Sequence, residues 1–333
     1  MCGIVGYIGK SKACPILIKG LLRQEYRGYD SAGISTIEGN EICTIKRKGR
    51  VKELQSDKNI DKLSGTVGIA HTRWATHGKP SDINAHPHSD CHNNFSIVHN
   101  GIIENYAEIR EFLINAGYTF VSDTDTAVIP NLIDYYYSKE DSSDKFLNAV
   151  NKAIKDVRGS YAISAISKFE PNRIIAIRKD NPLVVGTSED AKYIASDIHA
   201  ILEYTNNIYI LKDNDLVSLT PNEITFYDKD LQKIDRKVEI IDWDAKAADK
   251  GEYEDFMLKE ISEQPQAIRE TIGTRIIKDK PCDFSDINIS KEYLSNVSRI
   301  YIVACGTAAY SGIAVKTIFE RLTRHSSRSR YSF

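Results

Sequence analysis

The chain opens with MCGIVGYIGK (residues 1–10), an apolar run that carries a cysteine in second place. A cysteine inside a protein is usually a small, inert hydrophobe. Cys2 differs in one respect. If Met1 is removed, a thiol and a free α-amine share one carbon, and that pair can act as a nucleophile with its own base. Residues 2–8 also read as a buried strand. The sequence therefore predicts a strand that begins at a candidate nucleophile.

The composition is that of a globular protein with no strong attraction to nucleic acid or membranes. The 333 residues favour two domains, and 41% hydrophobic with 27% charged residues is ordinary for a soluble chain. The formal net charge is only −2. No apolar run approaches the roughly 18–20 residues of a membrane span, and CGIVGYI is too short for a signal peptide. We therefore expect a cytoplasmic protein without nucleic-acid or membrane partners.

Cysteine usage supports the same compartment. Six cysteines are scattered along the chain without a C-x-x-C pair, a pattern that suits reduced thiols. They are Cys2, Cys14, Cys43, Cys91, Cys282 and Cys305.

Hydrophobic patterning predicts an α+β fold with mostly antiparallel sheets. Short strand-like runs recur up to about residue 240, close together and joined by turn residues such as DND and TPNE, which favours hairpins over βαβ crossovers. A helix is expected at about 11–24 with Ser11 as its N-cap. Further helices, which would cover the sheet faces, are expected at about 103–116, 125–137 and 144–156.

The character of the chain changes near residue 240. A polar stretch, WDAKAADKGEYEDF, reads as a linker, and residues 254–273 then read as a helical segment with a break or kink at Pro265. From residue 299, RIYIVACGTAAYSGIAVKTIFERL predicts a strand, a Gly-Thr turn and a helix that open a parallel α/β unit. One strand and one helix cannot bury a core alone, so we expect a second domain that begins but is not finished.

Six of the eight histidines lie between residues 71 and 101. One alternative is a metal site formed by His86, His88, Cys91 and His92. The spacing H-x-H-x-x-C-H matches none of the usual zinc patterns, which argues against this reading and predicts no metal. We favour a polar loop in which His86, His88 and His92 form hydrogen bonds with backbone groups.

Three further sites each admit two readings. Arg73 follows a strand-like run, where a planar guanidinium suits either a bidentate carboxylate contact or a surface ion pair. Asn100-Gly101 is first of all a hairpin turn, yet an amide beside a glycine N–H also makes a good oxyanion hole. Asp125 could cap the following helix or bind a substrate ammonium.

Together these stretches resemble the glutamine–fructose-6-phosphate aminotransferase (isomerizing) family, also called glucosamine-6-phosphate synthases. The resemblance covers about residues 2–324, with its motifs in the family's order. It implies a class II glutamine amidotransferase domain with the N-terminal-nucleophile αββα sandwich, while VACGT resembles the start of a sugar-isomerase domain. The motifs are CGIVGYIG, EYRGYDSAG, AHTRWATHG, NAHPH, VHNGIIENY, YTFVSDTDTAVI and IASD.

The resemblance implies a domain layout. It places a glutaminase domain at 2–240, a linker and helical segment at 241–290, and a truncated start of the sugar-isomerase domain at 291–324. An aberrant tail at 325–333 would follow.

The resemblance also assigns catalytic roles to three residues. Cys2, as the mature N-terminus, resembles the thiol nucleophile that attacks the glutamine side-chain amide, with its α-amine as the base. Asn100 and the N–H of Gly101 match the family's oxyanion hole. Attack, loss of ammonia and hydrolysis of a glutamyl thioester require no metal and no organic cofactor.

Glutamine recognition is assigned in the same way. Arg73 matches the residue that grips the α-carboxylate, and Asp125 matches the one that holds the α-ammonium. Thr76 and His77 lie on the loop that closes over glutamine. The resemblance gives supporting roles to Arg27, packed beside the nucleophile, and to Trp74, the aromatic gate of the ammonia path, whose alternative role is loop packing.

The C-terminal stretch departs from the family. The sugar-isomerase half would continue beyond residue 333, so its base and lysine have no counterpart here. Thr307 is a weak candidate for a sugar-phosphate contact, because Ala308 stands where many relatives have a serine. The tail HSSRSRYSF can be read as a shifted frame of a family-like segment, IPVEVDIASE, which predicts a frameshift near residue 324. The alternative is a genuine short basic tail. We therefore expect L-glutamine as the substrate, and fructose 6-phosphate only in a full-length enzyme.

Two alternatives remain. A different class II amidotransferase, such as one that forms phosphoribosylamine or asparagine, is disfavoured by EYRGYDSAG and VACGT. A destabilised fragment that only partners other subunits is the non-enzymatic alternative, since a half-built α/β unit would expose strand edge and apolar helix face. The full-length family usually forms homodimers through the half that this chain lacks, so a homodimer is doubtful here.

Overall fold

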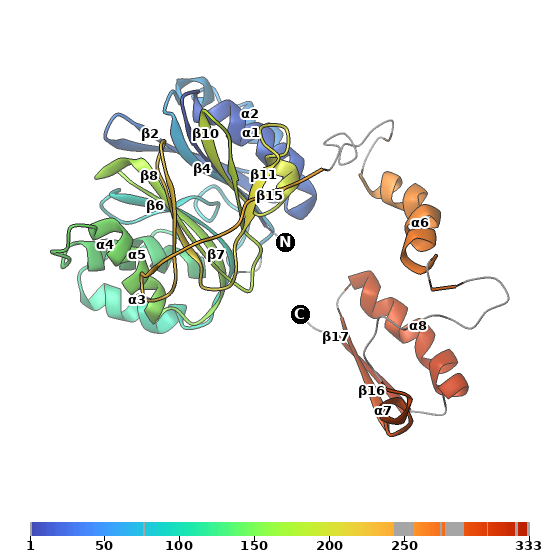
Figure 1. Cartoon of the computed structure of the whole chain (residues 1–333). Coiled ribbons are helices and arrows are strands. Elements are labelled where there is room, and N and C mark those ends of the chain that lie inside the picture. Colours follow the sequence, from blue (N-terminus) through green and yellow to red (C-terminus); the bar gives the residue numbers. More distant parts are fainter. Residues whose placement is uncertain are drawn as a thin grey trace. The chain divides into compact units, whose positions relative to one another are not determined.

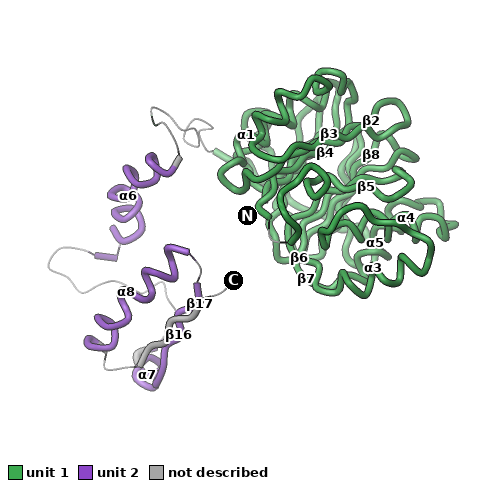
Figure 2. The backbone as a smooth tube through the Cα atoms, turned by 180° about the vertical axis from the view of Figure 1, so that it is seen from behind, with its two compact units in different colours: residues 1–256 green, residues 257–333 purple. Residues whose placement is uncertain are grey.

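A computed structural model describes residues 2–75, 77–242, 253, 256–273, 275–276, 290–304, 306–323 and 326–331. The chain divides into two compact units, Met1–Phe256 and Met257–Phe333 (Figure 2). Each unit is described by itself below.

The larger unit contains two sheets in which every named strand pairs with its neighbours in antiparallel fashion. The eight-stranded sheet has the order β15-β11-β9-β10-β1-β4-β2-β3, and the seven-stranded sheet has the order β14-β13-β12-β8-β7-β6-β5. The first sheet consists of β1 (Gly3–Gly9), β2 (Ser31–Glu38), β3 (Glu41–Lys48), β4 (Val67–Arg73), β9 (Val184–Thr187), β10 (Ala191–Ala195), β11 (Asn207–Ile210) and β15 (Glu239–Ile240). The second consists of β5 (His88–Ser89), β6 (Phe95–Ile103), β7 (Gly159–Ser167), β8 (Glu170–Lys179), β12 (Leu216–Leu219), β13 (Ile224–Tyr227) and β14 (Lys233–Ile234).

Helices cover the outer faces of both sheets, so the unit has four layers (Figure 1). Helices α1 (Ala13–Gln24) and α2 (Val51–Gln55) pack on the eight-stranded sheet, and α3 (Tyr106–Asn115), α4 (Val128–Tyr137) and α5 (Lys145–Asp156) pack on the other. Four short 3₁₀ turns complete the unit: η1 (Glu25–Arg27), η2 (Ile60–Lys62), η3 (Asp125–Ala127) and η4 (Ile198–Ala200). The α+β fold class with mostly antiparallel sheets is confirmed.

Strand β1 shows how the sequence builds these layers. Successive side chains of a strand point to opposite faces of its sheet. Val5 and Tyr7 accordingly join the cluster beneath α1 and α2, whereas Ile4 and Ile8 join the cluster between the two sheets. A third cluster lies between the seven-stranded sheet and α3–α5. The uninterrupted apolar run of β1 therefore reflects burial on both faces of a central strand.

The position of β1 also sets the position of the candidate nucleophile. β1 lies between β10 and β4, and Gly3 pairs with Thr72 in the antiparallel register. The start of β1 therefore lies beside the end of β4, which brings Cys2 next to Arg73 and Trp74, some seventy positions away in sequence.

One local prediction, the N-cap of the first helix, is wrong. The N-cap of α1 is Lys12 rather than Ser11, and it forms no side-chain capping bond. The backbone carbonyl of Gly65 instead accepts a hydrogen bond from the Ala13 N–H at 2.8 Å, while the Ser11 N–H donates to the Tyr7 hydroxyl at 3.1 Å. The Gly65 carbonyl, far away in sequence, thus takes the place of a side-chain cap.

Helix α6 (Phe256–Ile272) runs on through Pro265, so of the predicted break or kink the break does not occur, and the kink stays a prediction. The predicted linker falls largely on residues 243–252, outside the described part of the chain. In the smaller unit, α7 (Lys291–Ser295) precedes β16 (Arg299–Ala304), α8 (Gly306–Thr323) and β17 (Ser326–Tyr331), and β16 and β17 pair in parallel. The predicted strand and helix from residue 299 are present as β16 and α8, but Gly306 and Thr307 belong to the helix rather than to a turn. Among the described residues, none of the helices is both long and apolar enough to cross a membrane.

Candidate active site

Cys2 lies directly before β1, with its side chain at the end of β4. The Trp74 N–H donates a hydrogen bond to the Cys2 Sγ at 3.2 Å, and the Trp74 carbonyl lies 3.6 Å from the same sulfur. Burial raises the pKa of the Cys2 thiol, while the Trp74 N–H and the Arg73 guanidinium act in the opposite direction. The thiol therefore has a backbone donor and a cation that stabilise its ionised form.

The carbonyl of Cys2 is held from two sides. The Arg27 Nε donates to it at 3.2 Å, and the Asn100 Nδ2 donates at 3.1 Å. Arg27 is itself buried at the end of η1 and bonds the Asp197 carboxylate at 3.2 Å. Arg27 thus lies beside the nucleophile, where the resemblance expects it, and fixes the chain at Cys2.

Arg73 is the last residue of β4 and is only 4% exposed. Its Nη2 donates to the backbone carbonyls of His77 and Gly78, the second at 3.0 Å. Its Nη1 is buried and has no hydrogen-bond partner among the described residues. The surface ion-pair reading is therefore wrong, because Arg73 is buried. Its Nη1 remains available to donate to a further acceptor.

Asp125 lies at the start of η3 and is also buried. Its carboxylate accepts hydrogen bonds from the Ile103 N–H at 2.8 Å and the Thr126 N–H at 2.9 Å. Helix α4 begins only after Ala127 and has no side-chain cap, so the helix-cap reading of Asp125 does not hold for α4. Burial lowers the pKa of Arg73 and the negative charge of Asp125 acts to raise it, so the anion and the cation lie close enough to interact.

Asn100 and Gly101 lie inside strand β6, opposite Ala162 and Tyr161 of β7. The hairpin-turn reading is therefore wrong. The Asn100 Nδ2 donates to the Cys2 carbonyl and to the Ser196 Oγ, and its Oδ1 faces His71 Nε2 at 2.9 Å. The amide thus lies beside the nucleophile, as an oxyanion donor would.

Gly101 has φ +132°, and an added Cβ would lie 2.0 Å from the Ser160 carbonyl oxygen. We expect Gly101→Ala to destabilise the fold by about 3 kcal/mol or more, because backbone strain and a backbone clash add. Urea unfolding measures this loss. Gly117→Ala is the matched control: its φ is +94° but no atom lies within 4 Å of the added Cβ, so it should cost only about 1–2 kcal/mol. Equal losses in the two variants would contradict the clash argument.

The remaining predicted site residues are placed as follows. His77, whose carbonyl accepts from Arg73 Nη2, packs its ring edge-on against Tyr106, with ring centroids 4.8 Å apart. Trp74 is 46% exposed and packs edge-on against Tyr29. Thr76 lies outside the described residues. Thr307 is exposed on α8 of the smaller unit.

The histidine-rich stretch is more buried than expected. His86 Nδ1 accepts a backbone N–H bond from His99 at 3.3 Å, as predicted. The predicted backbone partners of His88 and His92 are wrong, because His88 pairs with the Thr124 hydroxyl and His92 pairs with the Asp134 carboxylate. Long-range packing supplies these side-chain partners.

The alternative metal set of His86, His88, Cys91 and His92 does not come together in the described parts of the chain. The group found there is Asp90, His92 and Asp134, with ligand atoms within 4.8 Å. Its carboxylate oxygens already accept hydrogen bonds, those of Asp134 from Tyr118 and Asn94.

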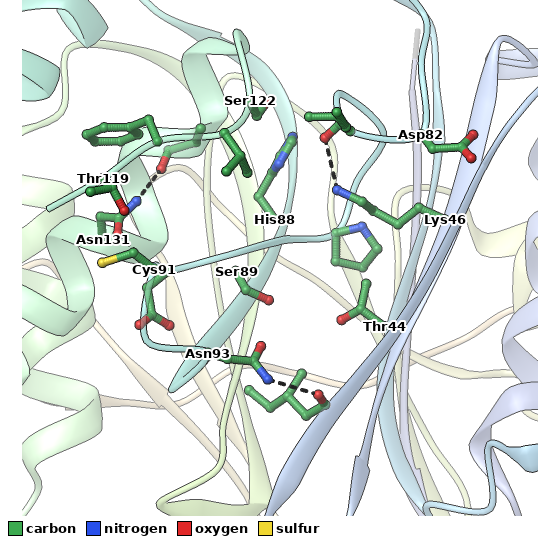
Figure 3. A pocket seen from close by; sticks show the side chains of 17 residues that line it. Thr44, Lys46, Asp82, His88, Ser89, Cys91, Asn93, Thr119, Ser122 and Asn131 are labelled. Carbon is green, nitrogen blue, oxygen red and sulfur yellow. Dashed lines mark hydrogen bonds between the residues drawn. The ribbon is translucent and has the colours of Figure 1, made fainter.

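A cavity of about 690 Å³ lies between β3, β5 and the start of α4 (Figure 3). Lys46, His88 and Cys91 are among the residues that line it, but Cys2, Arg73, Asn100 and Asp125 are not. The candidate catalytic residues therefore do not open into this cavity.

Three residues that contact the site were not singled out from the sequence. Asp30 accepts a hydrogen bond from the Ala75 N–H, Ser196 bridges the Ile4 N–H and the Asn100 amide, and His71 bonds the same amide. Each lies in a recognised motif, EYRGYDSAG, IASD or AHTRWATHG. Only the fold shows which atoms they bond.

Comparisons with known proteins agree with this arrangement. A family model described as a glutamine amidotransferase domain matches residues 71–203. Glutamine–fructose-6-phosphate aminotransferases [isomerizing] from Clostridium acetobutylicum and Clostridium perfringens are 52% and 50% identical, each over 97% of this chain. The enzyme of that name from Thermotoga maritima is 44% identical over the same share. In each case the chain spans about half of the relative's length, 52%.

Solved structures show the fold. A glutamine phosphoribosylpyrophosphate amidotransferase from B. subtilis superposes with a TM-score of 0.63 at 17% identity, over 98% of this chain and 65% of that one. This likeness confirms the four-layer αββα sandwich as the fold of the larger unit. Residues 71–203 thus match a glutamine amidotransferase domain, and the chain is similar in sequence to glutamine–fructose-6-phosphate aminotransferases (isomerizing) over about half of their length.

Proposed function

We propose that this chain, once Met1 is removed, hydrolyses L-glutamine to glutamate and ammonia with Cys2 as the nucleophile. One observation carries the proposal. A thiol with a backbone donor, a side-chain amide and an arginine whose Nη1 has no partner in the described part of the chain meet at the start of β1. These are the groups that acyl transfer from an amino-acid amide needs.

The reaction balances with the groups at hand. The Cys2 α-amine takes the thiol proton, and the sulfur attacks the side-chain amide carbon, whose carbonyl electron pair moves to oxygen. The Gly101 N–H and the Asn100 Nδ2 stabilise that oxyanion, and Nδ2 gives up one of its two present acceptors, the Cys2 carbonyl or the Ser196 Oγ, to do so. As the oxyanion collapses, the C–N bond breaks, and the protonated amine gives its proton to the leaving ammonia. Water then hydrolyses the thioester and restores the thiol.

Selectivity for glutamine comes from its two charged ends. Arg73 offers to the α-carboxylate its Nη1, which no described residue bonds, and Asp125 offers its carboxylate to the α-ammonium. Both side chains are buried, where charge pairing is stronger than in water. An amide without both ends would leave one of these charges without a partner. Thr76 and His77 belong to the loop that would close over the bound amino acid.

The whole-protein reaction is a wider proposal. The relatives' name implies that ammonia passes to fructose 6-phosphate to form glucosamine 6-phosphate. We assign the glutaminase half to residues 2–240 and a sugar-isomerase start to residues 291–324. Thr307 is the one sugar-phosphate candidate within this sequence. A cytoplasmic location fits the described cysteines, Cys2, Cys14, Cys43 and Cys91, which are all free.

The purified chain tests the proposal directly. We expect glutamate and ammonia to form in equal amounts from glutamine. With fructose 6-phosphate present, we expect no glucosamine 6-phosphate. Enzymatic glutamate detection and chromatography of the amino sugar measure the two products. A folded chain with a free Cys2 N-terminus that releases no glutamate would refute the proposal, and formation of the amino sugar would refute the restriction to the glutaminase half.

A further inference from the structure

We infer that His71 is a positioning residue that holds the Asn100 amide with its NH₂ group toward Cys2. The inference rests on the proposed role of Asn100 as an oxyanion donor and adds a residue that the resemblance did not assign. The evidence is the three hydrogen bonds of the buried Asn100 amide and the stacking of His86 on His71.

The orientation of the Asn100 amide follows from its neighbours. One amide atom lies 3.1 Å from the Cys2 carbonyl oxygen and 2.8 Å from the Ser196 Oγ. A backbone carbonyl can only accept a hydrogen bond, so the amide atom beside it must be the NH₂ nitrogen. The Ser196 Oγ also accepts the Ile4 N–H at 2.9 Å, which agrees with this assignment. The amide oxygen must then face His71.

The same logic fixes the tautomer of His71. The Asn100 Oδ1 lies 2.9 Å from His71 Nε2, and an amide oxygen can only accept. His71 Nε2 therefore carries a hydrogen and donates it. His71 is fully buried, and burial lowers the pKa of its ring to about 3, so the ring is neutral in ordinary buffers. A neutral donor can hold the amide without adding a second buried cation beside Arg73.

Three other buried rings keep His71 in place. We call His71, His86, His88 and His99 the histidine cluster. The His86 ring stacks on His71 with centroids 4.2 Å apart and planes at 16°, and His88 packs edge-on against His86 at 4.6 Å. The His99 N–H donates to His86 Nδ1. His71 therefore has little freedom to turn its Nε2–H away from Asn100.

The histidine cluster is also linked through Thr126 to Asp125, the residue proposed to bind the substrate ammonium. The His99 ring nitrogen Nδ1 lies 2.8 Å from the Thr126 hydroxyl, and the Thr126 N–H donates to the Asp125 carboxylate. Within the described residues, His71 bonds Asn100, whereas the Asp125 carboxylate accepts hydrogen bonds from Ile103 and Thr126. Loss of the His71 donor should therefore act on the amide and leave Asp125 in place.

A specific kinetic effect follows. Without a donor at position 71, the buried Asn100 Oδ1 loses its partner, and the amide can rotate its NH₂ away from Cys2. That step weakens oxyanion binding but not the grip on the two charged ends of glutamine. Loss of a whole oxyanion donor costs about 10²–10³-fold in kcat. We expect a donor-free variant to lose about 10–100-fold in kcat, since the amide remains in the site.

The experiment compares His71→Phe, which keeps a ring without a donor, with His71→Gln, which restores an N–H donor. His71→Phe should lower kcat for glutamine hydrolysis while KM stays within about twofold. His71→Gln should recover most of kcat. Alkylation of Cys2 by iodoacetamide, which needs no oxyanion hole, should proceed at the wild-type rate in both. The control is His92→Gln, at a partly exposed histidine that bonds Asp134, which should keep wild-type kinetics.

Each other outcome is decisive. A wild-type kcat in His71→Phe, a rise in KM that matches the fall in kcat, or no recovery in His71→Gln would overturn the inference. Failure of both variants to fold would show that His71 acts on the fold rather than on Asn100, and would overturn it too. If the wild-type chain itself hydrolyses no glutamine, the proposed function fails instead, so the two failures are distinguishable.

Discussion

Cys2→Ala is expected to lower kcat for glutamine hydrolysis by about 10⁴-fold or more, because the step that forms the thioester has no other nucleophile. The structure gives the thiol a place that no other described cysteine shares. It lies at the start of β1, with the Trp74 N–H as donor and the Asn100 amide on the adjacent carbonyl. Glutamate release by the purified variant, measured against the wild type, checks this expectation.

Two controls separate chemistry from packing. Cys43→Ala removes a partly buried thiol from β3, away from the candidate site, and should leave the rate unchanged. A chain that retains Met1 should be as inactive as Cys2→Ala, because the α-amine that serves as base would then be part of a peptide bond. The intact mass of each protein shows which N-terminus it carries. Full activity in Cys2→Ala or in the Met1-bearing chain would contradict the mechanism.

The sequence was sufficient for the fold class because the controlling signals are local. Apolar runs bounded by turn residues identify strands, and short connections predict antiparallel pairs. The helices at α1, α3, α4 and α5 were found for a similar reason, since their apolar positions recur at helical spacing. The four layers then follow, because the apolar faces of the strands and helices must be buried against one another.

Local signals failed where distant atoms compete for the same groups. Ser11 looks like a helix cap, but the Gly65 carbonyl from the loop before β4 takes the Ala13 N–H. Asn100-Gly101 looks like a hairpin turn, but β7 pairs with both residues and keeps them inside a strand. Neither partner can be read from the neighbouring sequence, because each depends on the register of strands that are far apart in the chain.

For the candidate site, the sequence predicts which residues take part but not how they are brought together. The motifs that contain Cys2, Arg73, Asn100 and Asp125 could be recognised, but their residues come from the start of β1, the end of β4, the middle of β6 and η3. The sheet register brings the first two together, since Gly3 pairs with Thr72. The role of His71 depends on a single bond across two sheets, from β4 to β6, and no sequence pattern predicts such a bond.

Arg73→Met is expected to raise KM for glutamine by about 10–150-fold, the equivalent of the roughly 1.5–3 kcal/mol of a charged hydrogen bond. The argument depends on Nη1, which is buried and without a partner among the described residues, whereas Nη2 already holds the carbonyls of His77 and Gly78. The substrate carboxylate is the acceptor that Nη1 lacks. The KM of Arg73→Lys for glutamine should lie between those of the wild type and Arg73→Met. A lysine ammonium keeps the charge but cannot bond the loop and the substrate in one plane.

A substrate analogue makes this prediction specific. 4-Aminobutanamide keeps the side-chain amide and the amine of glutamine but lacks the α-carboxylate. Wild type should use it poorly, and Arg73→Met should not weaken its use further, because the contact that the variant removes is already missing. Arg47→Met removes a partly exposed arginine of β3 that bonds Asp57, and it should leave KM unchanged for both substrates. If Arg73→Met raises KM for the analogue by the same factor as for glutamine, Arg73 holds the loop at His77 and Gly78 rather than the carboxylate.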